Sequence, residues 1–580
     1  MKPISSNMFK LTAISAMILS ATSASAALYE IIEISPPSAF ESAYGVAIQP
    51  GNINIAVPEA KKLGCFLASE CKDFRLAGET RRVATHDGQA VDGVSYREEV
   101  AFGLDIGFDY IQDQRDFEIY CRRFLGYATC DTWASVHWNE WDKERRGNTS
   151  PNATAFIEEE QTPLTVSGAG NENIVINSLT SEAKPIGIKI AAGDVSGFRR
   201  NSVQAIGITQ NPENNWLQTR AWKTDGTYTV GSIANNQGNF YTSKGAIWDN
   251  SGKMTEIPWQ SEKANHSNRL AQGSIRDFVI AKDDDVNEHI YAVGYNTFYD
   301  DRNFMQASIS KIARSDLDAY FSSSDASEAK PNWETKTVSG ATVRENGTSG
   351  DGIGIHAYSK LMAVNDNLIA VGEAKRSRAA DGAFTNRLFV VTALDNPKAE
   401  FLTGELFFAG AGGKVGAINN FNEIVGQIDT EESREAGGKP RRKRGFIYPY
   451  GTLEQGSVPD RQAIFNNRAW LLDDLTNDGN VTGHNNQYRI LDATDINDAG
   501  VISATALRCI GGYDSTAHNA QCGAGKGQEK TVAVKLVPIA GKTHEDISPR
   551  GMDDLVVERN GAGLGLWSLI LGGLLWFRRK

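Results

Sequence analysis

A recurring pattern of β-hairpins limits the folds open to this chain. Five segments share an apolar lead-in, a turn rich in Asn, Asp and Gly, and a second apolar stretch. Asn and Asp tolerate left-handed turn geometry and hydrogen-bond to their own backbone, so the pattern predicts strand, tight turn, strand. The segments are residues 43–57, 203–216, 361–374, 415–428 and 493–506.

A second type of hairpin accompanies some of these segments. Aromatic and aliphatic residues alternate before a turn, which is typical of a strand with one buried face. The segments are residues 220–228, 245–257, 387–396 and 444–454. Two hairpins together give four strands, the size of a propeller blade. We therefore expect an all-β fold, a β-propeller or propeller-like toroid of about six to seven blades with an insertion-rich N-terminal part. A β-sandwich array is the alternative.

The N-terminus has the pattern of a secretory signal peptide. A basic start precedes the apolar stretch Leu11–Leu19, and small residues follow it. Ala24 and Ala26 give the A-x-A arrangement that signal peptidase accepts, so we expect cleavage between Ala26 and Ala27. A buried N-terminal helix is the alternative. The pattern predicts an exported chain.

The C-terminus combines a glycine-rich spacer, an apolar stretch at 566–577 and a basic end. The apolar stretch is shorter than the ~20 residues of a straight membrane-spanning helix, and the positive-inside rule puts the terminal cations at the cytoplasmic face. A permanent tail anchor is one interpretation of this segment. The residues concerned are Gly561, Gly563 and Gly565 in the spacer and Arg578, Arg579 and Lys580 at the end.

The tail resembles the GlyGly-CTERM sorting tail of gammaproteobacterial envelope proteins, although Ala562 interrupts the paired glycines. That resemblance implies transient insertion in the inner membrane, cleavage near the glycines by a rhomboid-type protease (rhombosortase), and passage to the cell surface or medium by type II secretion. Residues 417–427 and 493–502 resemble the HAF extracellular repeats. The combination resembles an uncharacterised exported gammaproteobacterial family with a domain of unknown function, and this resemblance implies no known activity.

Five parts of the chain follow from these features. They are a signal peptide at 1–26, N-terminal blades with disulfide-containing insertions at 27–190, HAF-like hairpin repeats at 191–540, a linker at 541–560 and the sorting tail at 561–580.

Charge argues against nucleic acid as a partner. The net charge is −12, and losing the five cations of the two ends, Lys2 and Lys10 included, would make it −17. Such a surface repels phosphate backbones. The basic run 439–444 follows several glutamates, and we interpret it as a solvated loop, with a polyanion-binding patch as the alternative.

Six cysteines form three close pairs along the sequence. In an oxidising compartment, an even number at short spacing favours disulfides. A zinc site is disfavoured because no pair has metal-ligand spacing. The expected pairs are Cys65 with Cys71, Cys121 with Cys130, and Cys509 with Cys522.

Catalytic and metal motifs are missing from the sequence. It contains no G-x-S-x-G elbow, no phosphate-binding loop and no H-E-x-x-H. Residues 474–480 resemble the start of a calcium loop, but Asn485 stands in place of the bidentate glutamate, so we expect no cofactor, with calcium as a weak alternative. Trp133, Trp138 and Trp141 are interpreted as core under an insertion, with a carbohydrate-stacking platform as the alternative.

Three functions remain open. The favoured one is a surface or secreted binding scaffold, with a glycan or a protein as ligand, because the chain has scaffold signals and no catalytic motif. A secreted propeller hydrolase acting on polysaccharide with two carboxylates, and an envelope structural protein, are the alternatives.

Overall fold

The computed structural model describes residues 27–553, except for 55–57, 68–70, 84–88, 99–101, 105–106, 166–169, 210–217, 238–239, 261–270, 284–286, 299–303, 324–329, 344–354, 381, 433–440 and 452–457. Within this part, no helix is long and apolar enough to cross a membrane. The expected cleavage residues Ala24 and Ala26 and the whole sorting tail lie outside the described residues. Ala27 is the first described residue.

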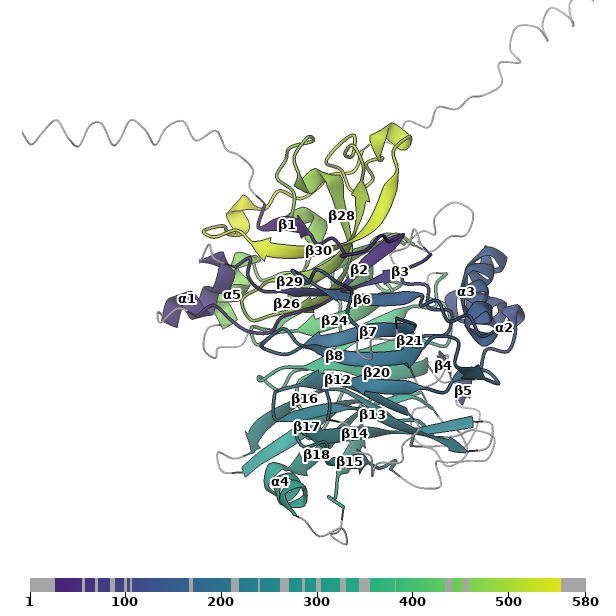
Figure 1. Cartoon of the computed structure of the whole chain (residues 1–580). Helices are drawn as coiled ribbons and strands as arrows, with labels where there is room; N and C mark the ends of the chain where they lie inside the picture. The colour runs from purple at the N-terminus through teal and green to yellow at the C-terminus, as the bar shows by residue number, and fades with distance from the viewer. Residues whose placement is uncertain are drawn as a thin grey trace, which may run out of the picture.

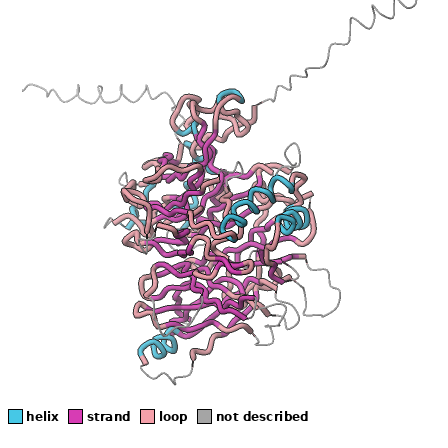
Figure 2. Tube along the Cα trace, turned by 45° about the vertical axis from the view of Figure 1, so that its right-hand side comes forward, coloured by secondary structure: helices cyan, strands magenta, loops and turns pink. Residues whose placement is uncertain are grey.

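The structure is mostly β, with a few helices at its periphery (Figures 1 and 2). One three-stranded sheet contains β2 (Ser42–Ile48), β3 (Leu76–Arg81) and β6 (Ala153–Ile157). A seven-stranded sheet consists of two antiparallel groups, joined by a single parallel pair between β11 and β12. The first group is β7 (Glu172–Leu179), β8 (Pro185–Ala191) and β11 (Val203–Ile206), and the second is β12 (Gln218–Thr224), β13 (Tyr228–Gln237), β14 (Phe240–Asp249) and β15 (Met254–Ile257).

Four further sheets have four antiparallel strands each. Three follow chain order: β16 (Ser274–Asp283), β17 (Asn287–Asn296), β18 (Gln306–Ala313) and β19 (Glu334–Thr337); β20 (His356–Val364), β21 (Ala370–Arg376), β22 (Asn386–Val391) and β23 (Glu400–Phe401); β24 (Gly413–Ile418), β25 (Glu423–Asp429), β26 (Lys443–Pro449) and β27 (Trp470–Leu471). The last sheet joins β28 (Tyr488–Ile496), β29 (Ile502–Cys509) and β30 (Glu529–Pro538) to β1 (Tyr29–Glu33), so the two ends of the described chain share one sheet (Figure 1).

Helices and two short pairs of strands lie outside these sheets. The helices are α1 (Pro58–Leu63), α2 (Gln114–Tyr120), α3 (Cys130–Arg145), α4 (Arg314–Ser322), α5 (Val458–Ile464) and α6 (Leu472–Leu475), with single turns η1 (Gly64–Phe66), η2 (Cys121–Leu125), η5 (Asn485–Gln487), η6 (Gly523–Gly525) and η7 (His544–Asp546). The ladders are β4 (Phe102–Leu104) with β5 (Gly107–Asp109), and β9 (Val195–Ser196) with β10 (Arg199–Arg200).

The seven groups of strands contact one another through their first strands. Strand β2 contacts β7, and the series continues through β12, β16, β20, β24 and β28, which in turn contacts β2. Apolar clusters fill the space between neighbouring groups, for example Val293, Ile309, Leu361 and Phe389 between the β16 and β20 sheets. The core is therefore divided among the interfaces between sheets.

Each first strand carries a β-bulge. The register against its neighbour shifts by one residue in every case, and β20 and β28 have two shifts each. A bulge leaves one residue without a partner and re-aims its side chain. The residues at equivalent bulges are Val46, Asn177, Trp222, Arg276, Met362, Gly416 and Thr494.

Three predicted hairpins, at 361–374, 415–428 and 493–506, are confirmed as β20–β21, β24–β25 and β28–β29. Their turns begin at Asn365, Asn419 and Asn497, and each Asn Oδ1 accepts a backbone N–H within its own turn. Each Nδ2 donates to the next sheet: Asn365 to Asn419 O at 2.9 Å, Asn419 to Asn497 O at 3.1 Å and Asn497 to Gln49 O at 3.0 Å. The recurring Asn thus closes its turn and joins the sheets.

Two predicted hairpins are wrong. In segment 43–57, strand β2 pairs with β3, because α1 and η1 intervene before its partner. In segment 203–216, of which residues 210–216 lie outside the described part, β11 pairs with β8 and, at Val203, with β12 in parallel. In both places the partner strand comes from outside the segment, where a local turn pattern carries no information about pairing.

The cysteines and tryptophans stabilise insertions. Three disulfides join the expected pairs, with Cα–Cα distances of 5.8 Å for Cys65–Cys71, 5.5 Å for Cys121–Cys130 and 5.4 Å for Cys509–Cys522. Trp141 on α3 is fully buried and donates from Nε1 to Ile111 O at 3.2 Å. The core interpretation therefore holds for Trp141, and a three-tryptophan stacking platform is wrong.

Candidate functional site

A central cavity lies where the seven first strands meet. Its volume is about 370 Å³, and every first strand contributes lining residues, including all seven bulge residues. Residues of the N-terminal insertion, from Gln89 to Glu98, also line it. We call this site the central cavity.

Glu98 neutralises two cations of this cavity. Arg276 Nη2 lies 2.6 Å from Glu98 Oε2, and Lys360 Nζ lies 3.4 Å from Glu98 Oε1. Burial opposes ionisation, but Arg276 and Lys360 outweigh it and lower the pKa of Glu98 to about 2. Arg276 also stacks on the ring of Trp222, with its Cζ 3.7 Å from the ring centroid. Glu98 is therefore a fixed anion between two sheets.

The other carboxylates at the insertion side are likewise paired. Arg81 lies 3.0 Å from Glu79 Oε2 and 2.6 Å from Asp92 Oδ1, and Arg97 pairs with Glu79. On the opposite strands, Lys414 Nζ lies 3.1 Å from Asp492 Oδ2. Each of these acids is therefore paired with a cation.

Asp277, Asp495 and Lys223 also line the central cavity. Asp277 accepts the N–H of Val364 on the next sheet at 3.1 Å, and Asp495 accepts the N–H of Ile48 at 3.0 Å. Burial raises the pKa of Asp277 to about 6 and also raises that of Asp495, while Lys223 opposes both changes. Both carboxylates accept backbone hydrogen bonds at each oxygen, so they join neighbouring sheets.

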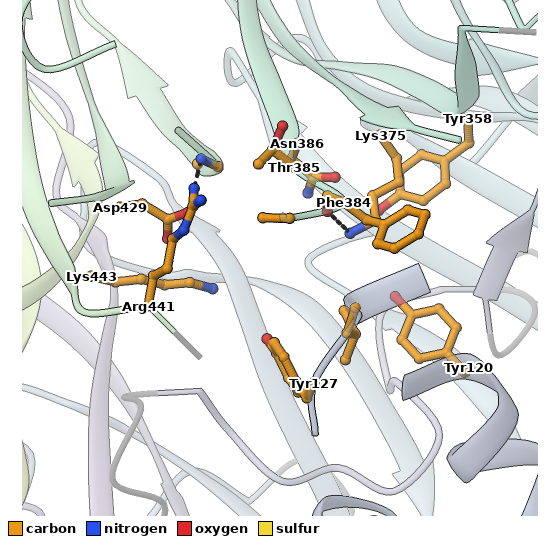
Figure 3. Close-up of a pocket in the computed structure, with 14 residues that line it drawn as sticks. Tyr120, Tyr127, Tyr358, Lys375, Phe384, Thr385, Asn386, Asp429, Arg441 and Lys443 are labelled. Atoms are coloured by element: carbon orange, nitrogen blue, oxygen red, sulfur yellow. Dashed lines mark hydrogen bonds and ion pairs between the residues drawn. The ribbon is translucent and has the colours of Figure 1, made fainter. Parts of the chain in front are cut away.

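A second pocket lies between the β20 sheet, the β24 sheet and the α2–η2 insertion. It has a volume of about 150 Å³. Figure 3 shows Asp429, Arg441 and Lys443 on one side, Lys375 and Tyr358 on the other, and Tyr120 and Tyr127 along the edge contributed by the insertion. We call this site the basic pocket. It shares no lining residue with the central cavity.

Lys375 is the central cation of the basic pocket. Its side chain is buried, and Nζ donates to Phe384 O at 2.6 Å. Burial, and then the nearby Lys443, lower the pKa of Lys375 to about 7. Asp429 accepts the Gly412 N–H at 2.9 Å, and burial raises its pKa. Arg441 Nη1 lies 3.9 Å from Asp429 Oδ2.

The basic run contradicts our sequence interpretation. Residues 439 and 440 lie outside the described part, but Arg441 and Arg444 are buried, and Lys443 is half-buried on β26. A solvated loop is therefore wrong for 441–444. Strand β26 begins at Lys443, and Lys443 and Arg444 pair with Asp429 and Ile428 of β25. A charge run alone does not reveal that pairing.

Sequence reasoning missed the central cavity, and it indicated the basic pocket only through the polyanion-binding alternative for the run 439–444. The central cavity forms only when seven strands that are distant in sequence pack together. The repeated hairpins did indicate which of these strands would be equivalent. The expectation of no cofactor, with calcium as a weak alternative, stays a prediction. Asp474 accepts the Arg550 N–H at 2.7 Å and lies 3.0 Å from His518 Nε2. Among the described residues, no group of three or more His, Cys, Asp and Glu side chains is placed to hold a metal.

The solved structures that match this chain have low TM-scores and low sequence identities to it. The Bombyx mori GH32 beta-fructofuranosidase BmSUC1 matches with a TM-score of 0.21 and 11% identity over 46% of this chain and 56% of that one. The polysaccharide lyase Uly1 matches with a TM-score of 0.26 and 12% identity over 58% and 75%. An alpha-L-arabinanase of Cellvibrio cellulosa matches with a TM-score of 0.22 and 9% identity over 47% and 88%. Likeness at these TM-scores carries no inference about activity.

Sequence comparison gives a clearer result. No curated protein matches the chain. A family model described as "Protein of unknown function (DUF3466)" matches residues 220–580, from the strand β12 to the last residue. The matched part includes the sheets β16–β19, β20–β23 and β24–β27 whole and most of the residues of the basic pocket. The chain belongs to the DUF3466 family.

Proposed function

We propose that this chain is an exported seven-bladed β-propeller that binds a neutral, polyhydroxylated ligand, a glycan, in its central cavity without transforming it. The observation that carries the proposal is the convergence of all seven first strands on one cavity, whose Glu98 and Asp492 carboxylates are paired with cations. A site with compensated charges favours ligands recognised by hydrogen bonds and stacking.

Ring closure is supported by two contacts. Strand β28 contacts β2, and β1 completes the sheet of β28–β30. Closure through strands from both ends would cover the edges that an open array exposes. In this proposal, residues 27–190 supply the N-terminal blades with their insertions, and residues 191–540 supply the remaining HAF-like repeats. Small-angle scattering that shows an elongated particle would contradict the ring.

Polar and aromatic groups around the cavity suit a sugar. Gln89, Asn177 and Thr494 supply amides and a hydroxyl, and Tyr44 supplies an aromatic ring. Aromatic faces stack on sugar rings at low entropy cost. No cofactor is part of this proposal.

Export would follow the route that the two ends predict. Signal peptidase cleavage after Ala26, transient insertion of the tail in the inner membrane, and rhomboid-type cleavage near Gly561–Gly565 would deliver the protein to type II secretion and the cell surface or medium. Three short disulfides support an oxidising destination. Mass spectrometry of the exported protein tests this route, because a retained C-terminal peptide would favour a permanent anchor.

A polysaccharide hydrolase is the second candidate, and one observation favours it. Burial raises the pKa of Asp277 to about 6, so this acid inside the cavity is about half protonated at pH 6. Its two oxygens, however, accept backbone hydrogen bonds, which argues for a structural role.

A glycan array combined with a reducing-end assay separates the candidates. Binding without release of reducing ends supports a binding protein, and release that is lost in Asp277→Asn supports the hydrolase. The absence of both binding and release favours a structural protein. Met362 lines the cavity, so Met362→Trp fills it and should abolish binding. Met362→Leu keeps the volume and is the matched control.

A further inference from the structure

Cations outnumber acids in the basic pocket. Lys375, Arg441 and Lys443 line it together with one carboxylate, Asp429. The protein as a whole is acidic, with a net charge of −12. A buried excess of positive charge is costly unless an anion compensates it.

An unsatisfied hydroxyl points to the same conclusion. Thr385 is 3% exposed and lines the pocket, and its Oγ1 has no hydrogen-bond partner. Buried hydroxyls are normally satisfied, so a group that is absent from the apoprotein would explain Thr385. Lys375, at 5% exposure, lies on the neighbouring strand, where β21 pairs with β22.

We propose that the basic pocket binds the oxyanion of a small ligand, a carboxylate or a sulfate group, between Lys375, Lys443 and the Thr385 hydroxyl. Its volume of about 150 Å³ limits the ligand to a small group or a terminal residue rather than the middle of a polymer. The tyrosines of the insertion, Tyr120 and Tyr127, cover one edge of the site. The inference concerns a second site and is independent of glycan binding in the central cavity.

Binding should depend on pH through Lys375. The groups that surround its amine are Asp429, Glu373, Arg441, Lys443, Tyr358, Tyr120 and Tyr127. Burial and Lys443 lower the pKa of Lys375, so its amine is mostly protonated at pH 6 and mostly neutral at pH 8. An anion favours the protonated form, and affinity should fall by up to about tenfold from pH 6 to pH 8.

The test titrates the full mature chain with sodium sulfate and with sodium acetate by isothermal calorimetry, in chloride that keeps the ionic strength constant. We expect saturable binding of at least one anion at pH 6. Lys375→Met should weaken it by more than tenfold, and Thr385→Val by about three- to tenfold. Lys336→Met, which removes an exposed cation paired with Glu334, is the matched control and should change nothing.

Each outcome decides the proposal. Binding by acetate alone identifies a carboxylate ligand, and binding by sulfate alone identifies a sulfate ester. The absence of saturable binding at pH 6, or binding that is unchanged in both Lys375→Met and Thr385→Val, would overturn it. Melting curves of the variants check folding, and unchanged glycan binding in Lys375→Met keeps this result separate from the fate of the central-cavity proposal.

Discussion

The central cavity and the basic pocket both bury charged side chains, but they compensate them differently. In the central cavity, Glu98 lies between Arg276 and Lys360, so these three charges compensate one another. In the basic pocket, Lys375 donates to a neutral carbonyl and has another lysine nearby. Removing a charge should therefore have opposite effects on stability in the two places.

The largest effect is expected at Glu98. Glu98→Ala leaves the buried Arg276 without its carboxylate and leaves Lys360 with Glu373 alone, and it should lower the free energy of unfolding by about 3 to 5 kcal/mol. Urea denaturation of the full chain measures this change. Glu334→Ala breaks an exposed pair with Lys336 and should cost less than about 0.5 kcal/mol. If the two variants were equally stable, the buried ion pairs of Glu98 would contribute no more to stability than the exposed pair of Glu334 and Lys336.

The same substitution predicts a pH dependence. The pKa of Glu98 is lowered to about 2 in the folded protein, against about 4.3 in an unfolded chain. Its contribution to stability is therefore present above about pH 4.3 and is lost as the pH falls towards 2. The difference in stability between the wild type and Glu98→Ala should shrink over that window.

An intermediate effect is expected from the disulfide beside the basic pocket. Cys121 and Cys130 tie η2, which follows Tyr120, to the start of α3. Replacing both by Ser should cost about 2 to 3 kcal/mol in the chain-entropy model. It should also weaken anion binding, because Tyr120 and Tyr127 lose their support, while glycan binding stays unchanged. Calorimetry with both ligands measures this separation, and an equal loss at the two sites would contradict it.

The smallest effect has the opposite sign. Lys375→Met removes a buried cation and should raise the free energy of unfolding at pH 7 by about 1 to 2 kcal/mol, after the loss of the bond to Phe384 O is included. Since the folded pKa of about 7 lies below the unfolded value of about 10.4, the wild type loses stability as the pH falls from 10.4 to 7. The gain should therefore disappear above about pH 10.4. A destabilised variant at pH 7 would show that the amine is compensated in the apoprotein.

Local sequence patterns predicted the hairpins whose two strands adjoin one turn. Asn365, Asn419 and Asn497 begin such turns, and their side chains satisfy neighbouring backbone groups. The pairing of β2 with β3 was not predictable in this way, because an insertion separates the strands. Turn chemistry acts over a few residues, whereas this pairing depends on the packing of the whole sheet.

Neither candidate site was predictable from motifs. The central cavity takes one bulge residue from each of seven strands, and these residues, Trp222 and Gly416 among them, share no chemistry. The basic pocket combines Lys375 with Arg441 and Lys443, which are distant in sequence. The run at 439–444 did signal positive charge, but burial reversed its interpretation, because strand pairing decides which cations face solvent.

The pairing of β1 with β30 imposes an order of events on folding. Tyr29 lies opposite Pro538, so the last sheet cannot be completed until nearly the whole chain has been synthesised and both ends share a compartment. Until then, β1 keeps unpaired backbone groups, and closing so long a loop is a slow, entropically costly step. During that interval, the β1 of one molecule can pair with the β30 of another. Exchange of this strand between copies is therefore the misfolding route to which the architecture is most exposed.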